Sequence, residues 1–259
     1  MNSTNLHPIT GIPKRVYAWL PDMYDNRDRA YTTTLEQISA LPTIVDQIGL
    51  TNPVEDQGQM GSCTGNATTS MMEIALGLTV PQSRLMAYYN GRVIDGSVKF
   101  DAGAQIRSVI KGLVKQGVAT EKQWKYTAAN LTRMPNKAAR TAGAKKAEMI
   151  AAKNLGYYRV GSLDSLMVAL AGGGTVTFGF LVTNAIQSLP ASGILAVPNN
   201  TDEVLGGHAV LAVGYDAIEK FVWVRNSWGT SWGLNGYFKM PFEWFTDPRR
   251  LVDDMWTLD

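Results

Sequence analysis

The stretch that decides the fold is Asp56-Gln57-Gly58-Gln59-Met60-Gly61-Ser62-Cys63-Thr64-Gly65-Asn66-Ala67. It begins as a glycine-containing loop and runs directly into a predicted helix, Cys63–Leu76. A cysteine in the first helical turn lies near about half a positive charge from the aligned peptide dipoles. That field favours the thiolate, which is the nucleophilic form of cysteine. The stretch therefore predicts a helix that begins at a reactive sulfur.

The loop before Cys63 fits the same chemistry. Gly58 and Gly61 leave room for a substrate backbone to approach closely. The side-chain amide of Gln57 and the backbone N–H of Cys63 could together hold a developing oxyanion. The alternative is that Cys63, the one cysteine of the chain, is simply a small buried hydrophobic residue, which is the commonest fate of a free cysteine.

Helices are predicted early in the chain and strands late. Apolar spacing and helix-forming composition predict helices over residues 106–114, 136–153 and 162–170. β-Branched and aromatic residues then predict strands over residues 175–180, 208–215, 221–226 and 236–240. A short loop between the second and third strands indicates an antiparallel hairpin. This order indicates an α+β protein of two unlike halves.

His208 and Asn226 are brought together by that hairpin. His208 opens an apolar strand after Gly206-Gly207, and Asn226 ends the next strand. Pairing of the two strands would place the Asn226 carbonyl where it can orient the imidazole. Taken alone, a histidine at a strand start is more often structural.

Together these pieces resemble the papain family of cysteine peptidases, in its bacterial and viral type without the long propeptide. The matching pieces, in the family order, are Gln57…Gly61-Ser62-Cys63, Gly207-His208-Ala209-Val210 and Asn226-Ser227-Trp228-Gly229. The separation of 145 residues between Cys63 and His208 lies in the range of about 130–150 that characterises this family. About 190 residues can be read against it. Met60 and Thr64 depart from the family, which usually has a disulfide-forming cysteine and an aromatic residue there.

The resemblance implies an α+β, papain-like two-lobed fold, with a helical half, an antiparallel β-barrel-like half and the active-site cleft between them. Three segments are expected: an N-terminal strap or short propeptide (residues 1–50), a mainly helical half (residues 51–158) and a mainly β half with a C-terminal tail (residues 159–259). The strap is expected either to pack permanently through Tyr17, Trp19 and Leu20, or to lie over the cleft and regulate it.

The implied activity is that of a cysteine endopeptidase acting through a thiolate–imidazolium pair and a thioester acyl-enzyme. Cys63 would attack the carbonyl, His208 would shuttle the proton, Asn226 would orient His208, and Gln57 would stabilise the oxyanion. Trp228 would cover the bond between His208 and Asn226. No metal or cofactor is implied. Two alternatives stay open: an acyl transferase of the transglutaminase type on the same site, and an inactive binding protein on the same fold.

Substrate contacts are expected at glycines and strand residues around the nucleophile. The side chain of the second residue before the scissile bond (P2) would enter a pocket, which we expect to favour a bulky apolar group. These positions could equally be plain strand and turn residues. The expected substrate-binding residues are Gly61, Ser62, Gly103, Val176, Phe178, Gly179 and Gly207.

Composition limits the other partners. The formal net charge is +2, from 24 basic and 22 acidic residues, and no basic cluster supports binding to nucleic acid or a membrane surface. No run of 18 apolar residues predicts a membrane span. One cysteine cannot form an intramolecular disulfide, which fits a reducing compartment, so a cytoplasmic protein is expected. A peptide or protein substrate remains as the expected partner.

Overall fold

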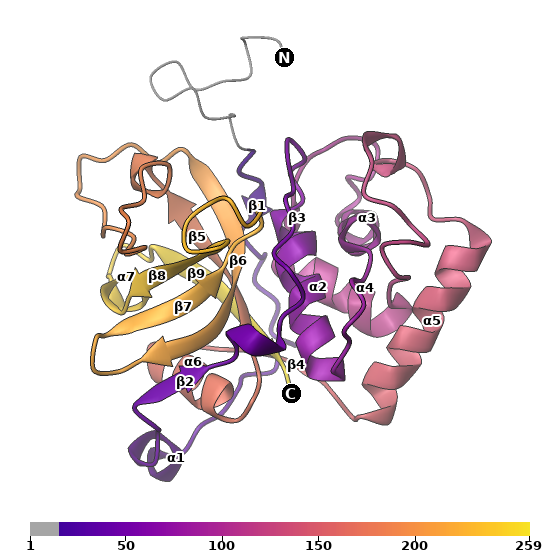
Figure 1. Cartoon of the computed structure of the whole chain (residues 1–259). Coiled ribbons are helices and arrows are strands. Elements are labelled where there is room, and N and C mark those ends of the chain that lie inside the picture. The colour runs from indigo at the N-terminus through magenta and orange to yellow at the C-terminus, as the bar shows by residue number, and fades with distance from the viewer. Residues whose placement is uncertain (1–15) are drawn as a thin grey trace.

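The computed structural model describes residues 16–259, which form two lobes side by side (Figure 1). The helical lobe contains α2 (Cys63–Leu76), α3 (Arg84–Asp95), α4 (Ile106–Gln116) and α5 (Lys137–Ala152). The other lobe is built on an antiparallel sheet. The α+β, two-lobed fold expected from the sequence is therefore confirmed.

The sheet has seven strands. Six follow the order β4 (Tyr157–Arg159), β9 (Val252–Leu258), β5 (Val176–Val182), β6 (Gly206–Asp216), β7 (Phe221–Arg225) and β8 (Tyr237–Pro241), and β2 (Ile44–Asp46) pairs with β6. The predicted hairpin is confirmed, since β6 and β7 pair antiparallel. The shorter elements are α1 (Leu35–Ser39), η2 (Ile48–Leu50), η3 (Ala128–Asn130), α6 (Leu163–Ala171), η4 (Asn184–Ile186) and α7 (Glu243–Thr246).

Local capping chemistry explains why the predicted helices begin and end where they do. Asn136 and Ser162 cap α5 and α6 by accepting backbone N–H bonds, as residues of this type do at a helix start. Gly117 ends α4 with a φ of 62°, which glycine adopts without steric cost. Helix α3 and strand β9 were not predicted, because buried charged residues interrupt their apolar patterns.

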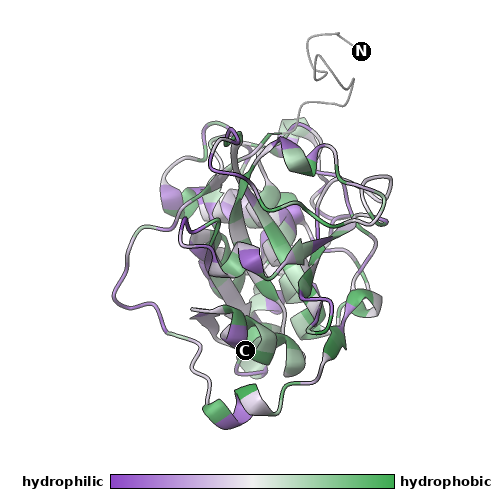
Figure 2. Cartoon of the chain, turned by 90° about the vertical axis from the view of Figure 1, so that its left-hand side faces the viewer, coloured by the Kyte–Doolittle hydropathy of each residue, from purple (hydrophilic) through white to green (hydrophobic). Residues whose placement is uncertain are grey.

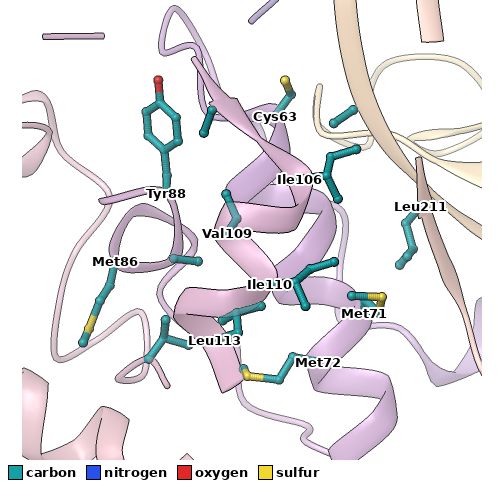
Figure 3. Close-up of a cluster of buried hydrophobic side chains, with 14 of the residues drawn as sticks. Cys63, Met71, Met72, Met86, Tyr88, Ile106, Val109, Ile110, Leu113 and Leu211 are labelled. Atoms are coloured by element: carbon teal, nitrogen blue, oxygen red, sulfur yellow. The ribbon is translucent and has the colours of Figure 1, made fainter. Parts of the chain in front are cut away.

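Helix α2 is held between α3 and strand β6. A Cβ at Gly65 would lie 2.6 Å from the Arg84 carbonyl oxygen, so this glycine allows α2 and α3 to approach closely. Lower on α2, Met71 and Met72 are fully buried in a cluster that Figure 3 shows with Leu211 of β6 beside it and Cys63 at its upper end. Core packing therefore fixes the first turn of α2 against the strand that carries His208.

A short parallel pair joins the N-terminal part of the described chain to the helical lobe. Strand β1 (Trp19–Leu20) pairs with β3 (Ala104–Gln105), and Figure 1 shows this pair between the lobes, near the start of α2. Of the expected N-terminal strap, residues 1–50, residues 1–15 lie outside the described part of the chain.

Hydrophobic residues gather on the helices and strands in the middle of the molecule, whereas the outer loops are largely hydrophilic (Figure 2). Within residues 16–259, no helix combines the length and the apolar character needed to span a membrane.

Candidate active site

His208 and Asn226 meet across the β6–β7 hairpin. The His208 Nε2 and the Asn226 Oδ1 are 2.8 Å apart, and both side chains are buried. Asn226 Oδ1 also accepts the backbone N–H of Ser227, which fixes the amide orientation. Since the carbonyl oxygen can only accept, Nε2 carries the proton in this contact. The pairing predicted from the sequence spacing is present.

Aromatic rings enclose this hydrogen bond. The Trp228 ring stacks on His208 at 5.0 Å between centroids with an interplanar angle of 29°. The Phe180 ring meets His208 edge-on at 5.8 Å. Trp228 is 2% exposed, so the indole covers the imidazole and keeps water from its contact with Asn226.

Cys63 occupies the first position of α2, as predicted. The backbone N–H of Ala209, the residue after His208, approaches the Cys63 sulfur, as do the N–H groups of Ala18 and Thr64. Three distant stretches of chain therefore converge on one sulfur atom: the start of α2, the start of β6 and the N-terminal region.

The pKa of the Cys63 thiol is shifted in the direction opposite to the sequence expectation. Burial raises the pKa of the Cys63 thiol above its ordinary value, and the surrounding N–H groups oppose this without reversing it. The side chain is fully buried, so no water solvates a sulfur anion. The expectation that the helix start favours the thiolate is thus not met in this closed arrangement.

Gln57 lies in the loop before Cys63, and its side chain is 1% exposed. Its Oε1 accepts from the Ser227 hydroxyl at 2.6 Å, which turns its Nε2 the other way. That Nε2 donates to the Met60 carbonyl at 2.9 Å and to the Val16 carbonyl at 3.4 Å. The carbonyl oxygens of Val16, in the N-terminal region, and of Met60 thus both accept from the side-chain amide that is expected to stabilise an oxyanion.

Residues 16–20, the crossing segment, run through this site between the two lobes. Tyr17 lies edge-on to His208, with ring centroids 6.2 Å apart, and Trp19 is 6% exposed. Glycines of both lobes face the segment, and a Cβ at Gly206 would lie 2.8 Å from the Tyr17 Cβ. Packing through Tyr17 and Trp19 fits the expectation for the N-terminal strap. Leu20 is 39% exposed, so its expected packing role is wrong.

The helical side of the site contains two of the expected glycines. A Cβ at Gly61 would lie 2.7 Å from the Ala18 Cβ, and one at Gly103 would lie 2.2 Å from the Ala18 carbonyl oxygen. Gly61 N–H donates to Asp101, and Gly103 N–H donates to the Tyr88 hydroxyl. The Ala104 N–H of the helical lobe donates a hydrogen bond to the Ala18 carbonyl. Both glycines therefore lie against the crossing segment.

Ser62 lies beneath the site instead of facing it. It is fully buried, and its hydroxyl bonds the Tyr126 hydroxyl while its carbonyl accepts from Asn66. These contacts anchor the turn before α2.

Four of the expected substrate-binding residues lie on β5 and β6, and two of them, Gly179 and Gly207, lie against Trp19. Cβ atoms added at Gly179 and Gly207 would lie 2.1 and 2.6 Å from ring atoms of Trp19. Val176 and Phe178 are instead buried in the core of the β lobe. Side chains alternate between the two faces of a strand, so residues 176 and 178 point away from the face that Gly179 presents. The expectation that Val176 and Phe178 contact the substrate is therefore wrong.

Two site residues escaped the sequence analysis. Asp254 accepts the indole N–H of Trp19 at 3.2 Å, and Tyr88 links Asp101 to Gly103. The pair Asp253-Asp254 inside an otherwise apolar run was the signal for the first, since a strand facing a core does not ordinarily carry unpaired carboxylates.

Comparisons with known proteins agree with this geometry. The profile of the family described as "Papain family cysteine protease" matches residues 42–244. The chain is 37% identical to xylellain, a cysteine protease from Xylella fastidiosa, with a TM-score of 0.83 over 94% of this chain and 95% of that one.

Two further proteins are similar to this chain in sequence. A peptidase C1-like protein of Acanthamoeba polyphaga mimivirus is 35% identical over 240 residues, covering 86% of this chain and 73% of the viral protein. Cysteine proteinase 3 of Entamoeba histolytica is 28% identical over 208 residues, and the match covers 78% of this chain and 63% of that protein. The chain belongs to the papain family of cysteine proteases.

Proposed function

We propose that this protein hydrolyses peptide bonds with Cys63 as nucleophile and His208 as proton carrier. The observation that carries the proposal is the buried His208–Asn226 bond under Trp228, next to the backbone N–H that approaches the Cys63 sulfur. With Nε2 facing Asn226, Nδ1 is the ring nitrogen assigned to exchange a proton with the thiol.

The reaction follows from these roles. The sulfur of Cys63 bonds to the carbonyl carbon, while its proton passes to His208. The oxyanion accepts from the Gln57 Nε2 and the Cys63 backbone N–H. Collapse breaks the C–N bond, and His208 protonates the leaving amine. Water, deprotonated by His208, then attacks the thioester; the carboxylic acid leaves and the thiol is restored.

We also propose that the crossing segment holds the enzyme in a latent state. The side-chain N–H of Gln57 donates to the Val16 carbonyl. The backbone N–H of Ala104 donates to the Ala18 carbonyl. The Trp19 ring fills the space between Gly179 and Gly207. A substrate needs the same donors and the same space. The segment must therefore leave before a substrate enters, and its departure also exposes Cys63 to water and lowers the desolvation that raises the pKa of the thiol.

The remaining assignments rest on the sequence. We infer that residues 51–158 and 159–259 act as two halves that hold the substrate between them, with residues 1–50 as strap or short propeptide. We also infer a reducing compartment such as the cytoplasm, because the one cysteine serves the reaction and no other is present to form a disulfide.

The test is digestion of a peptide library by the full chain, with the products identified by mass spectrometry. Cleavage should disappear in Cys63→Ser and in His208→Ala. Iodoacetamide should label Cys63 at pH 5–6 faster than a free thiol once the crossing segment is weakened, and His208→Ala should remove that advantage. Products linked to an added amine instead of water would identify acyl transfer. Labelling at the rate of a free thiol, with no cleavage, would identify an inactive protein.

A further inference from the structure

The loop that carries Gln57 and leads into Cys63 is anchored by a tyrosine from another part of the helical lobe. The Tyr126 hydroxyl donates to the Gln57 carbonyl at 2.9 Å and bonds the Ser62 hydroxyl. Burial raises the pKa of Tyr126 to about 12, so the hydroxyl keeps its proton and remains a donor at neutral pH. One side chain therefore contacts both ends of the turn between the two residues expected to supply the oxyanion donors.

The backbone of Gln57 is held from both lobes. From the β lobe, the Ser227 carbonyl accepts the Gln57 N–H at 2.8 Å, and from the helical lobe Tyr126 bonds the Gln57 carbonyl. The side-chain amide projects from this fixed backbone, so the direction of its Nε2 depends on both contacts. No disulfide reinforces the loop, since Cys63 is the one cysteine of the chain.

A buried arginine supports this tyrosine. The Arg84 guanidinium carbon lies 3.9 Å from the centre of the Tyr126 ring, and Arg84, which begins α3, is 8% exposed. Its charge faces the carboxylates of Glu55 and Glu121, which lie 3.7 and 3.9 Å from Nε. Glu121 also accepts the backbone N–H of Tyr126 at 2.6 Å. The cation and its carboxylate partner therefore fix the ring and the backbone of Tyr126.

The same arginine begins a directed chain of hydrogen bonds around the turn. Arg84 Nη1 donates to Asn66 Oδ1 at 3.0 Å and to the Asp56 carbonyl at 3.1 Å. Asn66 Nδ2 donates to the Ser62 carbonyl at 2.9 Å and to the Ser62 hydroxyl at 3.1 Å. Since the Tyr126 proton is already donated to a carbonyl, the Ser62 hydroxyl donates to Tyr126. Buried polar networks whose members pair with one another hold a single geometry.

We propose that Tyr126, supported by Arg84, is a positioning residue that sets the direction of the oxyanion donors, the Gln57 Nε2 and the Cys63 N–H. This inference rests on the proposed function. Attack on a peptide carbonyl forms an oxyanion, whereas alkylation of the thiol by iodoacetamide forms none. Loss of the Tyr126 hydroxyl should therefore slow peptide cleavage and leave the alkylation of Cys63 unchanged.

The test is Tyr126→Phe, which keeps the ring next to Arg84 and removes the hydroxyl. Steady-state kinetics on a cleaved library peptide use the full chain with Trp19→Ala as common background, so that departure of the crossing segment does not limit the rate. We expect kcat to fall about tenfold with KM changed by less than about twofold, since a small misplacement of catalytic groups costs up to about 10² in rate. Iodoacetamide should modify Cys63 at the rate of the background protein.

A double-variant cycle separates positioning from loss of structure. In Gln57→Ala the side-chain donor is absent, so adding Tyr126→Phe should lower kcat by less than about threefold. Partial unfolding would instead lower kcat by the same factor in both backgrounds. Tyr215→Phe is the matched control, because the Tyr215 hydroxyl likewise donates to a backbone carbonyl, that of Pro42 at 2.8 Å, but lies at the other end of β6 from the site. Its kcat should stay unchanged.

A normal kcat in Tyr126→Phe, an equal factor in the two backgrounds, or a parallel fall in Cys63 alkylation would overturn the inference and leave the proposed function intact. If Tyr126→Phe does not fold, Ser62→Ala removes the hydroxyl that bonds Tyr126, and it must show the same split between kcat and alkylation. Absence of cleavage in the Trp19→Ala background itself would refute the proposed function, and the inference with it.

Discussion

The carbonyl oxygen of Ala18 lies 2.2 Å from the point where any residue other than glycine would place its Cβ at position 103. No side chain tolerates that distance, so Gly103 permits the contact between the helical lobe and the crossing segment. The same holds across the site, where a Cβ at Gly179 would lie 2.1 Å from the Trp19 ring. The site is therefore closed by close backbone approach from both lobes, and this closure can be tested.

Removing the aromatic contact should open the site. In Trp19→Ala, the lost burial of the indole weakens the crossing segment, and iodoacetamide should label Cys63 at least about tenfold faster than in the wild type, since deletion of a buried aromatic side chain costs several kcal/mol. Leu20→Ala is the matched control, because Leu20 lies next in the chain but is 39% exposed. Equal labelling of wild type and Trp19→Ala would refute a closing role for Trp19.

A larger residue at position 179, in the β lobe, should also open the site. Gly179→Ala places a methyl group against the Trp19 ring, which must move, so Cys63 labelling should again accelerate. Gly161→Ala serves as control, because a Cβ there meets nothing within 4 Å. The measurement is the labelling rate together with the melting temperature of each variant. A Gly179→Ala protein that stays unlabelled and fully stable would contradict the described contact.

Loss of the imidazole partner should reduce turnover more than binding. Asn226→Ala removes the acceptor at 2.8 Å from His208 Nε2, and kcat should fall by about 10² or more with a smaller change in KM, in the range of general acid–base contributions. Steady-state kinetics on a cleaved library peptide measure this. The exposed Asn199 supplies the control Asn199→Ala, and a normal kcat in Asn226→Ala would exclude the positioning role.

The role of Gln57 as an oxyanion donor can be tested separately from the Ser227 contact that orients its side chain. Gln57→Ala removes the Nε2 donor, and kcat should fall by about 10²–10³. Ser227→Ala leaves Nε2 in place but removes the hydroxyl that bonds Gln57 Oε1, so its loss should be much smaller. Equal losses in the two variants would indicate that Gln57 acts only through packing.

Stability should depend on pH through Asp22. Burial, and then the negative charge of Asp254, raise the pKa of Asp22 from 3.8 to about 7. The folded protein therefore binds this proton more tightly than the unfolded chain, so Asp22 stabilises the fold below about pH 4 and this contribution is lost as the pH rises to 7.

The variant Asp22→Asn, which cannot ionise, should thus gain stability relative to the wild type between pH 4.5 and 7.5, by at least about 1 kcal/mol of unfolding free energy. Urea denaturation at the two pH values measures it. Glu219→Gln, in the exposed turn after β6, is the control and should show no such trend. A stability difference between Asp22→Asn and the wild type that does not change with pH would contradict the raised pKa.

The sequence by itself determined the elements that depend on local chemistry and on ordered motifs. The glycine loop before Cys63, the helix-forming stretches 136–153 and 162–170, and the strand spacing of His208 and Asn226 are short-range signals, and each predicted its place in the fold. The family resemblance added the lobes and the order of the site residues.

Only the tertiary structure decided which residues face one another. The face of β5 that carries Gly179 rather than Phe178, the bulge in β9 that turns Asp254 toward Trp19, and the passage of residues 16–20 over Cys63 all depend on strand register and on contacts between residues far apart in the chain. Such contacts leave no periodic trace in the sequence, because side-chain direction in a strand reverses with a shift of one residue. The burial that raises the pKa of the Cys63 thiol follows from the same long-range packing.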